Sequence, residues 1–209
     1  MNEPDPSVKS TERFSGRVEA YRRFRSRYPR EIISVLEERC GLTRESVVAD
    51  VGAGTGYMSL RMARRVGPSG KVYANDLQPE MLRRLRENAA KAGINNVETV
   101  LGAEDDPKLP AGRMDLVLLV DVYHEFSQPQ KMIDRIRDAL APGGRLVLLE
   151  YRKEDPNVPI LPEHKMSVAQ VKAEIEPEGL VLSQVIETLP RQHILILTKA
   201  AAAKAAAAH

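Results

Sequence analysis

The stretch VADVGAGTGYMS, residues 48–59, places glycines at three alternate positions directly after an apolar run. Glycine has no side chain and accepts positive φ, so such a loop lets a ligand approach the backbone closely. Two phosphate-binding patterns use loops of this kind. The dinucleotide fingerprint G-x-G-x-x-G needs its third glycine where Tyr57 stands, and a P-loop needs a Lys-Ser/Thr pair that does not follow here. Phosphate is therefore the weaker candidate for the ligand.

Short apolar runs alternate with amphipathic stretches along most of the chain. Five apolar runs predict strands: SVVADVG (46–52), KVYANDL (71–77), VETVLG (97–102), MDLVLLVDV (114–122) and RLVLLEY (145–151). Five amphipathic stretches predict helices: REIISVLEERCGL (30–42), YMSLRMARRVG (57–67), PEMLRRLRENAAKAG (79–93), PQKMIDRIRDALAPGG (129–144) and VAQVKAEIEPEG (168–179). A proline-rich loop, 154–167, precedes the last helix.

This alternation predicts an α/β fold, a Rossmann-like doubly wound sheet of about seven strands, mostly parallel, with helices on both faces. The segment 180–199 is expected to form a hairpin around Leu189-Pro190, which gives the sheet one antiparallel strand. Residues 31–199 would form this domain and residues 1–30 an N-terminal helical arm or lid. The alanine-rich tail, 200–209, is read as a tag or artefact and carries no functional argument.

Composition excludes several classes of protein. The net charge of +2 over 209 residues does not favour nucleic acid or a membrane as a partner. The single cysteine, Cys40, cannot form an internal disulfide or a cysteine-built zinc site, and it favours a reducing compartment. The N-terminus has no secretory pattern, and no run approaches the roughly 18 apolar residues of a membrane span. We expect a cytoplasmic protein.

Two acidic residues narrow the ligand. Asp76 ends the second predicted strand, about 20 residues beyond the loop, where a carboxylate accepts hydrogen bonds from ribose hydroxyls. Asp50 stands just before the glycines, and an acid there suits a cation better than a phosphate. S-adenosylmethionine combines both requirements, since it carries a nucleoside at one end and an ammonium and a sulfonium at the other.

Five segments occur in the order and spacing of the class I S-adenosylmethionine-dependent methyltransferases, and the chain resembles this family from Phe14 to Lys199. The segments are VADVGAGTG, ANDLQPEML, GAEDDPKLP, MDLVLLVDVYHEF and LAPGGRLVLLEYR. The resemblance implies a set of cofactor-binding residues: Asp50, Gly52, Ala53, Gly54, Gly56, Asp76, Leu77, Glu104 or Asp105, Asp121 and Val122. The glycine loop would pass under the methionine, and Asp50 before it would hydrogen-bond to the ammonium group directly or through water.

The same resemblance implies roles for the residues after the later strands. Asp76 would hold the ribose, and Leu77 would lie against the adenine. One of two neighbouring acids, Glu104 or Asp105, would contact the adenine amino group. Asp121 and the valine after it would flank the methionine and the position of methyl transfer.

Sequence defines the acceptor side less sharply, because methyl transfer is an in-line displacement that depends mainly on proximity and alignment. A base is needed only where the acceptor must lose a proton. The catalytic candidates are Tyr123, His124 and Glu150, although a structural role for His124 or Glu150 stays open. His164 could reach the site from the long loop. No metal site is expected, since His124, Glu125, Glu150 and His164 show no H-x-x-x-H spacing.

The N-terminal arm is rich in arginine, with seven arginines and one acid between Arg13 and Arg30. AYRRFRSRYP (20–29) resembles the F-R-P-x-Y-P lead-in of small-molecule methyltransferases related to those acting on aconitate and quinone precursors, except at Ser26, where proline is expected. We expect the arm to close over the cofactor and to meet an anionic acceptor, because the guanidinium group can pair both oxygens of a carboxylate. The acceptor-binding candidates are Tyr21, Arg22, Arg25 and Tyr28.

These features predict methyl transfer from S-adenosylmethionine to a small-molecule acceptor, with S-adenosylhomocysteine as the product. Several segments also resemble small bacterial methyltransferases, and the single cysteine excludes an arsenite methyltransferase. One alternative is a nucleic-acid methyltransferase whose arm holds phosphates, although the chain has no appended RNA-binding module and no NPPY-like signature. Another is a non-catalytic binding protein, or a different S-adenosylmethionine-dependent activity on the same scaffold.

Overall fold

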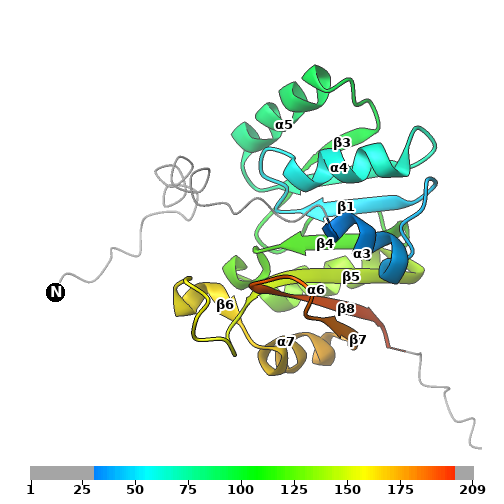
Figure 1. Cartoon of the computed structure of the whole chain (residues 1–209). Coiled ribbons are helices and arrows are strands. Elements are labelled where there is room, and N and C mark those ends of the chain that lie inside the picture. The colour runs from blue at the N-terminus through cyan, green and yellow to red at the C-terminus, as the bar shows by residue number, and fades with distance from the viewer. Residues whose placement is uncertain (1–30, 201–209) are drawn as a thin grey trace, which may run out of the picture.

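The computed structural model describes residues 31–200 as an eight-stranded sheet with helices on both faces (Figure 1). The strands are β1 Val47–Val51, β2 Lys71–Asp76, β3 Val97–Leu101, β4 Met114–Val120, β5 Leu140–Arg152, β6 Lys165–Met166, β7 Leu180–Ile186 and β8 Gln192–Lys199. The α-helices are α3 Glu31–Cys40, α4 Tyr57–Val66, α5 Pro79–Lys91, α6 Pro129–Ala139 and α7 Val168–Ile175. Single 3-10 turns are η1 Tyr123–Glu125, η2 Pro162–His164 and η3 Glu176–Glu178. The arm, 1–30, and residues 201–209 lie outside the described residues.

The strand order confirms the predicted doubly wound sheet. The order is β3-β2-β1-β4-β5-β8-β7, in which β1 to β5 are parallel and β8 runs antiparallel to β5 and β7. The chain reverses its direction of winding between β1 and β4, which is where ligands bind in such sheets. The short strand β6 was not predicted. It pairs with Tyr151 and Arg152 from within the proline-rich loop.

Both faces of the sheet are buried, which explains why its strands are apolar almost throughout. Alternate residues point to opposite faces: Val48 and Leu116 pack with α3 and α4, whereas Ala49 and Val117 pack with α6 and α7. In Figure 1, α3 and α4 lie in front of the sheet. Among the described residues, no helix has the length and apolar character needed to cross a membrane.

Two predicted helices end earlier than the sequence suggested. The helix that the sequence predicts up to a Pro-Gly-Gly turn at 142–144 already ends at Ala139, because Leu140 is extended and pairs with Met114 of β4. The helix expected over 168–179 ends at Ile175 and continues as the turn η3, which closes at Gly179 with φ of 82°. Both sequence ranges therefore include a proline-containing end that is not α-helical.

Cys40 offers a test of this packing. Its side chain is 2% exposed, and burial raises the pKa of the thiol to about 11, although the charge of Arg145 lowers it in part. Because the thiolate is the reactive form, native protein should resist a thiol-specific reagent at pH 8. Protein unfolded in denaturant should react with one equivalent per chain, as measured by absorbance. Rapid labelling of the native protein would contradict the placement of α3.

Candidate active site

The loop after β1 is held between the ends of two neighbouring strands. Gly52 has φ of 74°, and a Cβ built on it would lie 2.5 Å from Cγ2 of Val122, just after β4. No side chain fits there unless Val122 moves. The amide of Ala53 donates to the carbonyl oxygen of Asn75 at 2.9 Å, which ties the loop to β2. The glycines therefore lie at the point where the winding of the sheet reverses.

Asp76 ends β2 and reaches back to the glycine loop. Its Oδ2 accepts a hydrogen bond from the amide of Gly54 at 2.8 Å, and its Oδ1 accepts one from the amide of Gln78 at 2.9 Å. The fold thus joins the loop to the acid, which lies 22 residues further along the chain.

Asp50 is buried at the end of β1, and α4 holds its side chain. The hydroxyl of Ser59 donates to Oδ2 of Asp50 at 2.5 Å. Buried carboxylates need hydrogen-bond donors, and this one fixes the orientation of the group. Sequence reasoning did not identify Ser59, although it stands within the stretch that indicated the loop.

Two apolar side chains are exposed near Asp76, at the ends of β2 and β3. Leu77, after β2, is 40% exposed, and Leu101, at the end of β3, is 48% exposed. The two strands pair in register, with Asp76 opposite Leu101. Exposed leucines on neighbouring strand ends offer an apolar surface for a planar ring such as adenine. Only Leu77 was predicted from sequence.

The acids expected near the adenine lie in the turn after β3. The hydroxyl of Ser127 donates to Oε2 of Glu104 at 3.2 Å, and Nζ of Lys131 lies 3.9 Å from Oδ2 of Asp105. Both contacts link the turn to the segment after β4. Glu104 and Asp105 therefore both stay candidates for the contact with the adenine amino group.

Asp121 follows β4 in an uncommon backbone conformation. Its φ is 51°, in the left-handed region, and it is buried. Both of its carboxylate oxygens accept from Nε2 of Gln192 on β8, at 2.8 and 2.7 Å. Left-handed backbone in a residue other than glycine costs about 1–3 kcal/mol and is common at ligand sites. Gln192 was not predicted, because nothing in the spacing of the chain indicates that a residue of β8 contacts Asp121 at the end of β4.

His124 and Glu150 form a pair at the carboxyl edge of the sheet. Glu150 is fully buried on β5, and its Oε2 lies 2.7 Å from Nδ1 of His124. Burial lowers the pKa of His124, but the hydrogen bond and charge of Glu150 outweigh burial, so the pKa is raised overall. A carboxylate in this position makes Nδ1 the donor and points Nε2 away from the strand.

Tyr123 points in a different direction from His124. Its amide donates to Oε1 of Glu150 at 3.0 Å, but its ring is buried and its hydroxyl donates to Oε2 of Glu174 on α7 at 3.1 Å. Burial, with the charge of Glu174 adding to it, raises the pKa of the Tyr123 hydroxyl far above its usual range. This placement favours packing and positioning over proton transfer.

The proline-rich loop brings His164 to this pair. His164 Nδ1 lies 3.2 Å from Nε2 of His124, and the two rings meet edge to face with centroids 5.2 Å apart. Oε1 of Glu125 lies 4.0 Å from the same Nε2. The fold therefore brings the imidazole of His164, 40 residues further along the chain, to the consecutive residues His124 and Glu125.

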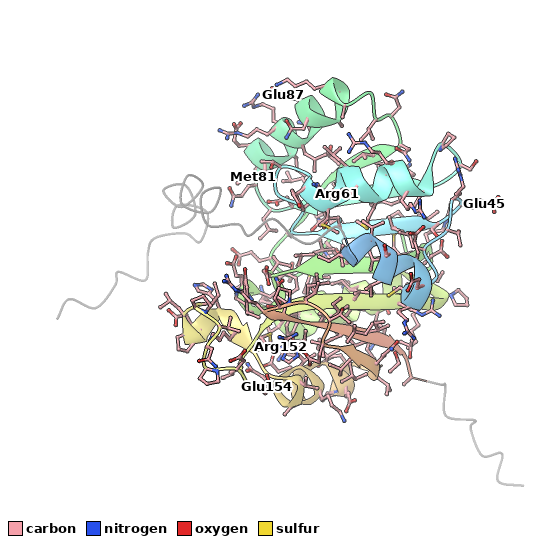
Figure 2. All side chains as sticks on the ribbon, viewed as in Figure 1. Glu45, Arg61, Met81, Glu87, Arg152 and Glu154 are labelled. Carbon is pink, nitrogen blue, oxygen red and sulfur yellow. The ribbon has the colours of Figure 1, made fainter. Side chains whose placement is uncertain are left out.

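A second polar cluster anchors the start of the same loop. Arg152 and Glu154, which Figure 2 labels at the end of β5, reach the region between β7 and β8. Arg152 pairs with Glu187, and His193 has Nδ1 2.6 Å from Glu187 and Nε2 2.9 Å from Glu154. The amide of Lys153 donates to the carbonyl of Met166 at 3.2 Å. These bonds hold both ends of the loop against β5.

Four predicted acceptor-binding residues lie outside the described residues: Tyr21, Arg22, Arg25 and Tyr28. Three residues of the site were missed from sequence: Ser59, Leu101 and Gln192. Ser59 had a local signal, since a hydroxyl in the first turn of α4 faces the preceding strand. Gln192 had none, because its contact with Asp121 spans 71 residues.

Comparison with known proteins identifies relatives of the whole sheet. Residues 42–199 match the family model described as a methyltransferase domain. The ubiquinone/menaquinone biosynthesis C-methyltransferase UbiE of Escherichia fergusonii is 32% identical over 114 residues, which are 54% of this chain and 45% of that protein. The chain thus spans less than half the length of the curated relatives that it matches.

Solved structures resemble the chain over a larger part of its length. An S-adenosylmethionine-dependent methyltransferase from Aquifex aeolicus is 30% identical, with a TM-score of 0.74 over 79% of this chain and 87% of that one. The cyclase SpnF is 16% identical, with a TM-score of 0.69 over 81% of this chain and 80% of that one. The second likeness concerns the fold alone.

Proposed function

Because the chain belongs to the class I S-adenosylmethionine-dependent methyltransferases, we propose that it transfers a methyl group from S-adenosylmethionine to a small-molecule acceptor. The observation that carries the proposal is the bond between the amide of Gly54 and the carboxylate of Asp76. This bond joins a carboxylate to a glycine loop that has no phosphate-binding signature, which supports a ligand with a ribose and without a phosphate at this position. UbiE is a C-methyltransferase of ubiquinone and menaquinone biosynthesis, and the similarity to it supports a small molecule over nucleic acid.

The proposed cofactor site runs along the ends of β4, β1, β2 and β3. The loop residues Gly52, Ala53, Gly54 and Gly56 pass beneath the methionine, and Asp50 serves the ammonium directly or through water. The ribose lies on Asp76, and the adenine lies against Leu77 with Leu101 beside it. Glu104 or Asp105 meets the adenine amino group, and Asp121 with Val122 flanks the methionine. After transfer, S-adenosylhomocysteine occupies the same residues.

On the acceptor side, we assign His124 as the catalytic residue and Glu150 as its positioning residue. Methyl transfer needs in-line alignment of the acceptor atom with the methyl carbon, and the bond pair returns to the sulfur. Where the acceptor carries a proton, Nε2 of His124 takes it, because the bond to Glu150 holds the donor hydrogen on Nδ1. Tyr123 supports the pair through its amide.

Replacing Asp76 tests the cofactor site. Asp76→Ala should weaken binding of S-adenosylmethionine and S-adenosylhomocysteine by about 1–3 kcal/mol, because the ribose hydroxyls lose a charged acceptor. Isothermal titration calorimetry measures this change. A matched control is Asp115→Ala: Asp115 also accepts a backbone hydrogen bond, from Val47 at 2.8 Å, but at the amino end of β1. Tight binding of NAD, or equal affinity in wild type and Asp76→Ala, would overturn the assignment.

A further inference from the structure

Three side chains at the edge of the sheet meet in a geometry that the proposed function does not require. His124 Nε2 lies 3.2 Å from Nδ1 of His164 and 4.0 Å from Oε1 of Glu125. All three ligand atoms lie within 4.8 Å of one another. Sequence spacing argued against a metal site, but the loop before β6 brings His164 to His124 across 40 residues.

The separation of the two imidazole nitrogens fits a divalent ion of the zinc class. Two nitrogens bound at about 2.0–2.1 Å to a tetrahedral ion lie roughly 3.3 Å apart, close to the spacing of the two imidazoles. Oε1 of Glu125, at 4.0 Å from Nε2 of His124, lies beyond this spacing, so the carboxylate would have to move toward the histidines when an ion binds. Two histidines and one glutamate form a donor set of catalytic zinc sites, which keep a fourth position open.

Glu150 supplies the support that such a site needs. A metal-binding histidine usually donates its second ring N–H to a carboxylate, which fixes the tautomer and the ring orientation. His124 has this partner, because Nδ1 lies 2.7 Å from the fully buried Glu150. The same bond turns Nε2 toward His164, whose Nδ1 donates a hydrogen bond to it when no ion is bound; an ion would replace that proton between the two nitrogens.

We propose that His124, Glu125 and His164 bind a zinc-class divalent ion whose open position receives the acceptor. The role in catalysis rests on the proposed function; the binding site does not. An acceptor hydroxyl or thiol on the ion loses its proton to water, since a bound divalent ion lowers its pKa. The resulting oxygen or sulfur lone pair forms the bond to the methyl carbon, and the C–S pair returns to the cofactor sulfur. When the ion is bound, it takes over the role proposed above for Nε2 of His124, because an imidazole nitrogen that ligates a metal cannot also accept a proton.

Metal binding is tested directly on the full chain. Protein stripped with a chelator is titrated with Zn²⁺ by calorimetry, and with Co²⁺ by visible absorption. We expect one ion per chain. His164→Ala and Glu125→Gln should each weaken binding by more than the roughly 10–100-fold loss typical of an outer-shell partner. The matched control is Glu163→Gln, an exposed neighbour of His164 outside the cluster, which should bind as wild type does.

Two results would overturn the site: no binding of Zn²⁺ by wild type, or equal affinity in wild type and His164→Ala. Circular dichroism of each variant, with the exposed Glu125→Gln as the mildest change, separates loss of ligands from loss of fold. S-adenosylhomocysteine binding in the stripped protein tests the proposed function separately. If the protein binds S-adenosylhomocysteine but not Zn²⁺, only the metal site is refuted. If it binds Zn²⁺ but not S-adenosylhomocysteine, only the cofactor assignment is refuted.

Discussion

Deleting residues 1–27 should abolish methyl transfer and leave a folded protein. The described residues 31–200 contain the sheet and helices that bury both of its faces, so we expect the core to fold without the arm. We propose that the arm closes over the cofactor and excludes water from the sulfonium. Without it the methyl donor would stay hydrated, and an anionic acceptor would lose its cationic partner. Turnover is followed by a coupled homocysteine assay, and folding by thermal unfolding.

The deletion also separates the competing roles of the arm. S-adenosylhomocysteine should still bind but exchange faster, as stopped-flow measurement would detect. Paired point variants refine this result: Arg22→Ala and Arg25→Ala should raise KM for the acceptor, whereas Arg13→Ala and Arg17→Ala should not. Binding of bulk tRNA with steep salt dependence, to which all the arginines contribute similarly, would instead support a nucleic-acid substrate. Full activity of the truncated protein would refute both roles.

His124→Ala should lower kcat by about 100-fold or more, within the range usual for a residue that handles a proton. Cofactor affinity should stay nearly unchanged, because the imidazole contacts Glu150 and His164 and not the glycine loop. Single-turnover kinetics with calorimetry on the same samples measures both quantities. If affinity and turnover fall together, His124 has a structural role.

Variants of Glu150 and His164, the two residues that contact His124, distinguish a general base from a metal ligand. Glu150→Gln keeps a hydrogen-bonding side chain but loses the charge, so kcat should fall less than in His124→Ala while KM changes little. His164→Ala should retain most activity if His124 acts alone as a base. It should lose activity to the same degree as His124→Ala if the two histidines share an ion.

The relative positions of the proposed cofactor-binding residues were predictable because their determinants are local. The glycine loop and Asp50 lie within one strand-to-helix connection, and Asp76 ends the next strand. Parallel strands bring their carboxyl ends to one edge of the sheet, so these residues could be joined to one ligand before their positions were known.

The acceptor half was harder to predict, because its geometry depends on long-range packing. Nothing in the spacing of the chain places Gln192 against Asp121, or His164 against His124. The latter contact depends on β6, a two-residue strand in a segment that reads as loop. Short strands carry too little periodicity for recognition, and loops of this length are positioned by tertiary contacts.

The loop between β5 and β6 is held at both ends, and this affects how related proteins can come to use different acceptors. Its two ends are clasped to β5 by the pairing of β6, by the bond from Lys153 to Met166 and by the contacts of Glu154. We expect that residues 155–163 can be exchanged between relatives while His164 and both fastened ends stay in place. Such an exchange should alter the choice of acceptor and leave cofactor affinity unchanged, because the proposed cofactor site lies on β1 to β4.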